Sequence, residues 1–313
     1  MLKLENFSSA DFLREHWQQS PCLITGALPD WGSALTGSEL AGLAMEEDVE
    51  SRLVLYDRRN SDWQVEHGPF EAETFQSLPD TDWTLLVQAV DLWSHDVDAI
   101  KSLFDFLPNW RLDDIMVSYA VAGGTVGPHF DHYDVFLLQA EGQRCWQIGS
   151  QCDASTPMVA NAPLKLLSEF TPEEEYLLNP GDMLYLPPGY AHYGVAKDSC
   201  QTYSIGFRSP TLGDLLADLA SETLSKPTDS VYRDPPSSNW QGERITEAHI
   251  DQIQTMLKTL AHDRQSLAHW FARFVTQPRY EPGTTPLIEQ RTAIVGNQEF
   301  VNGRKAPKPG TRA

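Results

Sequence analysis

The feature of the sequence that most constrains its fold is a rapid succession of short apolar runs between residues 114 and 208. Each run has the length of a β-strand, and glycine, proline or acidic residues separate it from the next. The runs are Asp114–Val121, Val135–Leu138, Cys145–Ile148, Met183–Leu186 and Thr202–Phe207. Many short strands with this punctuation favour an antiparallel barrel or a roll of two sheets, so the predicted class is α+β and mainly β.

The segment before these runs adds a helix and further strands. Asp11 is a suitable cap for a helix that Pro21 ends. Three apolar runs of strand length follow it, at Cys22–Ile24, Leu53–Tyr56 and Trp83–Val87.

The character of the chain changes after Pro210, where helical periodicity replaces the short runs. Leucines recur with the spacing of one helical face, at Leu212, Leu215, Leu216 and Leu219. A second amphipathic segment begins at Thr246 and includes Leu260, and a third begins at Asp263. Such a module is expected to pack against the barrel or against a second copy of itself.

The hydrophobic fraction and the net charge of the chain limit the kind of molecule that it is expected to bind. The chain has 313 residues, of which 41% are hydrophobic, so it can bury a sizeable core. Its 23 Lys and Arg against 44 Asp and Glu give a net charge of −21. This acidity opposes a nucleic-acid binder, which neutralises phosphates with clustered basic residues, but it would attract a basic protein.

Three further observations concern location. No run of about 18 apolar residues is present, as a membrane-spanning helix requires. The N-terminus lacks the charged and then apolar layout of a signal peptide. The four cysteines form no CxxC pair, which predicts neither disulfides nor a zinc cluster and favours the cytoplasm.

The sharpest local motif is the run from Gly127 to Asp134, which contains His129 and Asp131. In a strand, residues i and i+2 project from the same face, so this imidazole and this carboxylate would lie together. Such a pair can supply two ligands to a metal. Alone it is also the common pattern of a surface histidine beside a solvated aspartate.

His192 is the best candidate for a third ligand. It follows a Gly-Asp turn, the buried strand Met183–Leu186 and a rigid Pro-Pro-Gly bend that would aim its side chain. Two histidines and one carboxylate on one face of a metal leave other positions open, as in non-haem Fe(II) oxygenases. The metal ligands are therefore predicted to be His129, Asp131 and His192, with Fe(II) as the metal.

Arg144 begins the strand after the turn at Glu141 and Gly142. A hairpin there returns the guanidinium to the metal strand, where it can grip a carboxylate of a dicarboxylic acid through two hydrogen bonds. Ser118 lies on an alternating strand and is a candidate second donor to that carboxylate. The alternatives are an edge-strand arginine paired with Glu141 and an ordinary strand serine.

Three segments resemble the Jumonji C type bacterial ribosomal oxygenases of the RoxA kind. They are Gly127–Gly149, Asn179–Gly194 and Thr202–Pro210, and the likeness extends over roughly residues 5–275. The resemblance implies a 2-oxoglutarate- and Fe(II)-dependent arginyl hydroxylase that acts, with O₂, on the sixteenth protein of the large ribosomal subunit. It implies hydroxylation at the third carbon of the arginine.

The resemblance also implies the roles of individual residues. His129, Asp131 and His192 match the iron ligands, Arg144 matches the residue that binds 2-oxoglutarate, and Ser118 is its helper. The positions that line the pocket for the substrate arginine are matched by Asp114, Met116, Tyr133 and Ser204.

The fold implied is a double-stranded β-helix of the cupin or jelly-roll type. Its catalytic Jumonji C domain spans residues 1–210, and a helical module that forms a homodimer spans residues 211–278. Residues 279–313 are too few for the complete winged helix of the family, so they are expected to be an incomplete remnant or a tail, with a hairpin at Thr292–Asn302. Residues 1–278 carry a charge of −24 and residues 279–313 carry +3.

Three other functions are consistent with the same motifs. Two are enzymes of the superfamily, a hydroxylase of a ribosomal histidine and a lysine demethylase. The third is a metal-free, cupin-like binding protein, which leaves Arg144 without a role.

Overall fold

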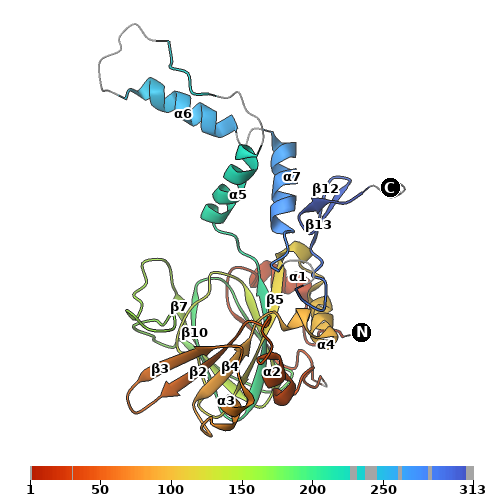
Figure 1. The fold of residues 1–313 in the computed structure, drawn as a ribbon, viewed down its shortest axis with the longest axis vertical. Helices are drawn as coiled ribbons and strands as arrows, with labels where there is room; N and C mark the ends of the chain where they lie inside the picture. The colour runs from red at the N-terminus through yellow and green to blue at the C-terminus, as the bar shows by residue number, and fades with distance from the viewer. Residues whose placement is uncertain are drawn as a thin grey trace. The chain divides into compact units, whose positions relative to one another are not determined.

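The computed structural model describes residues 2–29, 31–225, 231–236, 245–259, 263–280 and 284–307. The chain divides into two compact units. Figure 1 colours the chain by residue number, so the segments of each unit can be located in it. The first consists of Met1–Ser209 and Tyr280–Glu289, and the second of Pro210–Arg279 and Gln290–Ala313. No helix of the described segments combines the length and the hydrophobicity needed to cross a membrane.

Two antiparallel sheets build the first unit. The larger has eight strands in the order β1-β9-β6-β11-β5-β4-β2-β3, and the smaller has three in the order β10-β7-β8. The larger sheet contains β1 Cys22–Ile24, β2 Ser51–Asp57, β3 Asp62–His67, β4 Trp83–Val87, β5 Leu112–Ala120, β6 Val135–Glu141, β9 Met183–Leu186 and β11 Cys200–Phe207. The smaller contains β7 Arg144–Gln151, β8 Glu174–Leu178 and β10 Tyr190–Ala196. The predicted mixed α+β class with large antiparallel sheets is confirmed.

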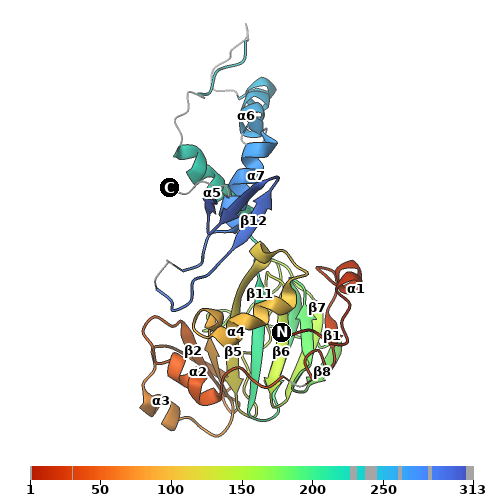
Figure 2. The same ribbon diagram turned by 90° about the vertical axis from the view of Figure 1, so that its right-hand side faces the viewer.

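Short helices cover one face of the larger sheet, as Figure 2 shows for α2 and α4. They are α1 Ser9–Glu15, α2 Gly37–Leu43, α3 Ala72–Gln76, α4 His95–Asp98, and the 3₁₀ turns η1 Val90–Leu92, η2 Ala99–Phe104 and η3 Asn109–Arg111. On β5, Ile115 and Val117 belong to the apolar core on this side. Because side chains alternate along a strand, Asp114, Met116 and Ser118 project from the other face, toward the interior between the sheets.

The interior is apolar at β6 and β9, where a second core joins the two sheets. Its members are Val135, Leu137, Trp146, Ile148, Leu178, Leu184 and Leu186. The interior face at β4 and β5 carries polar side chains instead, and these belong to the candidate site described below.

Asp134 is a fully buried carboxylate at the start of β6. It accepts hydrogen bonds from the Tyr185 hydroxyl at 2.6 Å, from Arg111 Nη2 at 2.7 Å and from Gln18 Nε2 at 3.0 Å. These three partners come from β9, η3 and the turn after α1, so one carboxylate joins four parts of the unit. Removing a partner from such a buried group typically costs about 3–5 kcal/mol.

Several sequence expectations differ from the structure. The cap of α1 is Ser8, whose hydroxyl accepts from the backbone N of Asp11, so the helix starts three residues before the predicted position. The strands β3 and β8 were not predicted: both lie at sheet edges, β3 is largely polar, and β8 begins with two exposed glutamates. The segment with His129 and Asp131 is an extended loop with one isolated β-bridge at His129, and it is not a strand.

The second unit contains helices and a small sheet. Its elements are α5 Leu212–Leu224, α6 Glu247–Thr259, α7 Arg264–Val275, β12 Thr292–Val295, β13 Gln298–Val301 and β14 Arg304–Lys305. Trp270 Nε1 donates to Asp218 at 2.7 Å, and Arg273 pairs with Glu222 at 2.6 Å, so α7 is held against α5. The predicted helices and hairpin are confirmed, whereas Leu260 and the tail from residue 308 lie outside the described residues.

Candidate metal centre

Three potential metal ligands come together from two parts of the first unit. His129 and Asp131 lie in the loop between β5 and β6, and His192 lies on β10. Each offers one ligand atom, and these atoms all lie within 4.8 Å of one another. The closest approach between His192 Nε2 and the Asp131 carboxylate is 3.7 Å. This separation suits a shared metal ion better than a direct hydrogen bond.

The backbone places these ligands. His129 N donates to His192 O at 3.0 Å, and His192 N donates to His129 O at 2.8 Å. Gly189 N donates to Asp131 O at 2.7 Å. Gly127 starts the loop with φ +79°, and a Cβ atom there would lie 2.4 Å from Leu166. Only glycine therefore fits this turn, and the turn directs the loop onto β10.

Both imidazoles are oriented for a metal. His129 Nδ1 lies 2.9 Å from Gly127 O, and His192 Nδ1 lies 2.9 Å from Tyr190 O. A carbonyl accepts only from a protonated Nδ1, so each Nε2 keeps the lone pair that a metal needs. Burial and the neighbouring His129 lower the pKa of His192 to about 4, so this imidazole is neutral near pH 7. The donor set therefore fits a divalent transition metal.

Arg144 is a buried cation on β7, with only 4% of its surface exposed. Its Nη1 donates to Ser118 Oγ at 3.4 Å, its Nε has no hydrogen-bond partner, and no ion pair to it is found in the described part of the chain. Burial lowers the pKa of this guanidinium. Arg111, by contrast, forms an ion pair with the Asp134 carboxylate. A buried cation without a counter-charge is costly, so Arg144 marks a place for an anion.

Trp146 lies between Arg144 and the predicted metal ligands. The Arg144 guanidinium is 5.3 Å from its ring, and the His192 ring is 5.9 Å from it. Trp146 is opposite Gly194 on β10, where a Cβ atom would lie 2.6 Å from the indole. The Trp146 indole therefore separates the Arg144 guanidinium from the three predicted metal ligands. The sequence did not predict this position of Trp146.

Asp114 is a second buried carboxylate of the interior, with 6% of its surface exposed. Its Oδ2 accepts from Gln88 Nε2 at 2.6 Å and from Ala89 N at 3.1 Å. Tyr133 keeps 43% of its surface exposed, but burial of its hydroxyl and the nearby carboxylates of Asp131 and Asp114 raise its pKa. The Tyr133 hydroxyl thus lies near both a predicted metal ligand and Asp114.

Met116 and Ser204 complete the set of residues predicted from the sequence. Met116 on β5 is directly opposite Ser204 on β11, so their side chains share a face. Along β5 the interior side chains are Asp114, Met116 and Ser118. They form a line from the carboxylate to the residue that contacts Arg144.

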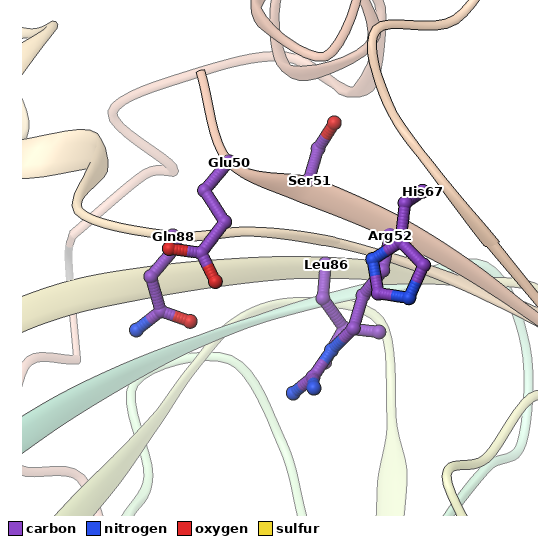
Figure 3. A pocket seen from close by; sticks show the side chains of 6 residues that line it. All are labelled: Glu50, Ser51, Arg52, His67, Leu86 and Gln88. Atoms are coloured by element: carbon purple, nitrogen blue, oxygen red, sulfur yellow. The ribbon is translucent and has the colours of Figure 1, made fainter. Parts of the chain in front are cut away.

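A pocket opens next to Asp114, seen from close by in Figure 3. It is lined by Glu50, Ser51, Arg52, His67, Leu86 and Gln88. The sequence did not predict it, because its residues come from separate strands and form no motif. His132, expected to face away from the metal ligands, is exposed.

Comparisons with known proteins agree with this geometry. Residues 99–215 match the model of the JmjC domain, and residues 171–269 match that of the AraC-like ligand binding domain. The ribosomal protein uL16 3-hydroxylase of Escherichia coli is 37% identical over 281 residues, which are 88% of this chain and 73% of that protein. A probable ribosomal oxygenase of Haemophilus influenzae is 38% identical over 270 residues, which are 85% of this chain and 65% of that protein.

A solved structure has the same fold. It is YcfD, a ribosomal oxygenase from Escherichia coli, in complex with cobalt and 2-oxoglutarate. The TM-score is 0.84 at 32% sequence identity, and the match covers 98% of this chain and 87% of that one.

The three predicted ligands can be tested through metal binding. His129→Ala and Asp131→Ala are each expected to lower the affinity for Co(II) at least tenfold, because two ligands hold a metal less tightly than three. Titration of the metal into the protein, followed by the visible absorption of Co(II), measures this affinity. His132→Ala changes an exposed histidine of the same loop and should leave it unchanged. Wild-type affinity in either ligand variant would contradict the assignment.

Proposed function

Because the chain belongs to the family of JmjC ribosomal oxygenases, we propose that it hydroxylates an arginine side chain of a large-subunit ribosomal protein, using Fe(II), 2-oxoglutarate and O₂. The observation that carries this proposal is the buried Arg144 guanidinium, which has no counter-charge among the residues that the structure describes and lies across one indole from three convergent metal ligands. The substrate class follows from the Escherichia coli relative, whose name gives uL16 as its target and the third carbon as its position.

His129, Asp131 and His192 would hold the iron. Three protein ligands leave positions open for a co-substrate and for oxygen. The metal, O₂ and 2-oxoglutarate supply the oxidation of a C–H bond to an alcohol, while 2-oxoglutarate is converted to succinate and CO₂.

Arg144 would bind the distant carboxylate of 2-oxoglutarate. A guanidinium forms two parallel hydrogen bonds to a carboxylate, and Ser118 supplies a hydroxyl at the same place. The bound anion would neutralise the buried cation, so the site binds its co-substrate partly by relieving its own unpaired charge.

Asp114, Met116, Tyr133 and Ser204 would hold the substrate arginine. The Asp114 carboxylate pairs with a guanidinium, and the Tyr133 ring offers a flat surface on which it can stack. Gln88 and Ala89 already orient Asp114, which lowers the entropic cost of binding. The acidic catalytic unit would also attract a basic ribosomal protein.

The second unit is proposed to form a homodimer through residues 211–278. Its helices α5 and α6 have no buried residues, and apolar side chains on them are exposed. These include Leu212, Leu216, Leu224, Ile250, Ile253 and Leu257. That residues 279–313 are a winged-helix remnant or a tail stays a proposal. The cytoplasmic location also stays a prediction, supported by four free thiols.

The reaction is tested by incubating purified large-subunit ribosomal proteins with the enzyme, Fe(II) and 2-oxoglutarate. We expect one protein to gain the mass of one oxygen atom on an arginine, with succinate formed in equal amount. Fragmentation mass spectrometry locates the residue. Oxygen on a histidine would favour the histidine hydroxylase, formaldehyde would favour the demethylase, and absence of both succinate and mass gain would favour a binding protein.

The role of Arg144 predicts opposite effects on binding and on stability. Arg144→Met is expected to raise the KM for 2-oxoglutarate about 100-fold, because it removes one partner of a buried charge pair. The ligand-free protein should be equally or more stable to urea, since an unpaired buried cation is replaced by an apolar side chain of similar length.

Arg58→Met is the matched control for this variant. Arg58 is half-exposed and pairs with Asp82 at the surface, so both quantities should change little. An unchanged KM in Arg144→Met would contradict the proposed clamp.

If the protein is a homodimer, a charge on the apolar face of α6 should halve the mass of the particle in solution. Leu257→Glu should convert the dimer to a monomer in size-exclusion chromatography with light scattering, because it places a charge in a buried apolar interface. Thr255→Glu adds the same charge on the other side of α6 and should leave the dimer intact. A monomeric wild type at micromolar concentration would contradict the proposal.

A further inference from the structure

We infer that the pocket beside Asp114 binds a second basic side chain of the substrate, close to the arginine that is hydroxylated. Figure 3 shows this pocket with the side chains that line it. This inference rests on the proposed function, since it takes an arginine at Asp114 as its starting point.

The pocket lies on the same face of the larger sheet as the candidate site. Arg52 on β2 is opposite Leu86 on β4, and Leu86 is opposite Ser118 on β5. Residues that are directly opposite in antiparallel strands project from the same face. Because Ser118 contacts Arg144 in the interior, Arg52 and Leu86 face that side as well. A polypeptide whose side chain reaches Asp114 therefore lies next to this pocket.

Gln88 connects the pocket directly to Asp114. Its Nε2 donates to Asp114 Oδ2 at 2.6 Å, which leaves the amide oxygen on the opposite side of the group. Figure 3 shows this oxygen directed toward the inside of the pocket, below the carboxylate of Glu50. The backbone N of Gln88 donates to Glu50 O at 2.9 Å, which keeps the two residues adjacent. One side of the pocket therefore presents two acceptors, a carboxylate and a carbonyl oxygen.

The opposite side presents donors. Figure 3 shows His67 across the pocket from Glu50, and Arg52 extending beside Leu86 with its guanidinium below them in the view. A lysine or arginine fits this arrangement, because its aliphatic stem can lie along Leu86 while its charged end meets Glu50 and Gln88. Arg52 and His67 are then placed to donate to carbonyl oxygens of the substrate backbone.

Spacing along the substrate agrees with this assignment. In an extended chain, side chains two residues apart lie on the same side, about 6.5–7 Å from one another. An arginine at Asp114 thus brings a neighbouring side chain within reach of Glu50. The pocket would select substrates in which this neighbour is basic.

A mutant cycle between enzyme and peptide tests the inference. Peptides carry one target arginine and, at each neighbouring position in turn, a single lysine, a single glutamate or alanine. For wild type, the best-placed lysine should lower the KM about 3- to 5-fold relative to alanine, as for a partly exposed ion pair. Glu50→Gln should remove this difference and leave kcat unchanged. Fluorescence anisotropy of labelled peptides should give the same ratios for binding.

Glu66→Gln is the matched control. It removes the same charge from the neighbouring strand, but Glu66 is opposite the core residue Leu53 and so projects from the other face. This variant should keep the preference for lysine, which separates a local contact from long-range attraction.

Three outcomes would overturn the inference. Equal KM values for lysine and alanine peptides in wild type would do so while leaving arginine hydroxylation intact. A preference for glutamate at these positions would assign the pocket to an acidic neighbour instead. Absence of arginine hydroxylation in wild type with whole ribosomal proteins would overturn the proposed function, and this inference with it.

Discussion

Two backbone hydrogen bonds between His129 and His192 fix the positions of the predicted metal ligands relative to one another. They join the loop that leaves β5 to β10, and so they connect the larger sheet to the smaller one. The position of the metal ligands is thereby set by main-chain geometry, together with the bond from Gly189 to Asp131. The other parts of the site are placed from the same two sheets, Arg144 from the smaller and Ser118 and Asp114 from the larger.

Strands made of an apolar run between clear boundaries were predictable from the sequence, whereas two edge strands without such a run, β3 and β8, were not. Met183–Leu186 has the predicted bounds, because four apolar residues lie between a Gly-Asp turn and a Pro-Pro bend. Asp62–His67 is a largely polar strand at a sheet edge, and Glu174–Leu178 is an edge strand that begins with two exposed glutamates. A strand with one partner and an exposed face needs little apolar content, so periodicity does not detect it.

A similar division applies to the site. The residues of local motifs, such as His129 and Asp131, were found because their spacing is itself informative. Gln88 and Arg52 were not found, since their placement depends on the register of β2, β4 and β5, which no short segment encodes. The buried pairing of Asp134 with Arg111 was missed for the same reason, because it joins residues that only the tertiary fold brings together.

The indole of Trp146 lies over Gly194 so closely that β10 has no room for a side chain there. These two positions are therefore constrained as a pair during evolution. A larger residue at position 194 is tolerable only with a smaller one at position 146, and that exchange would leave a hole between the guanidinium and the metal ligands. Related sequences should accordingly keep the tryptophan and the glycine together, or lose both along with the chemistry.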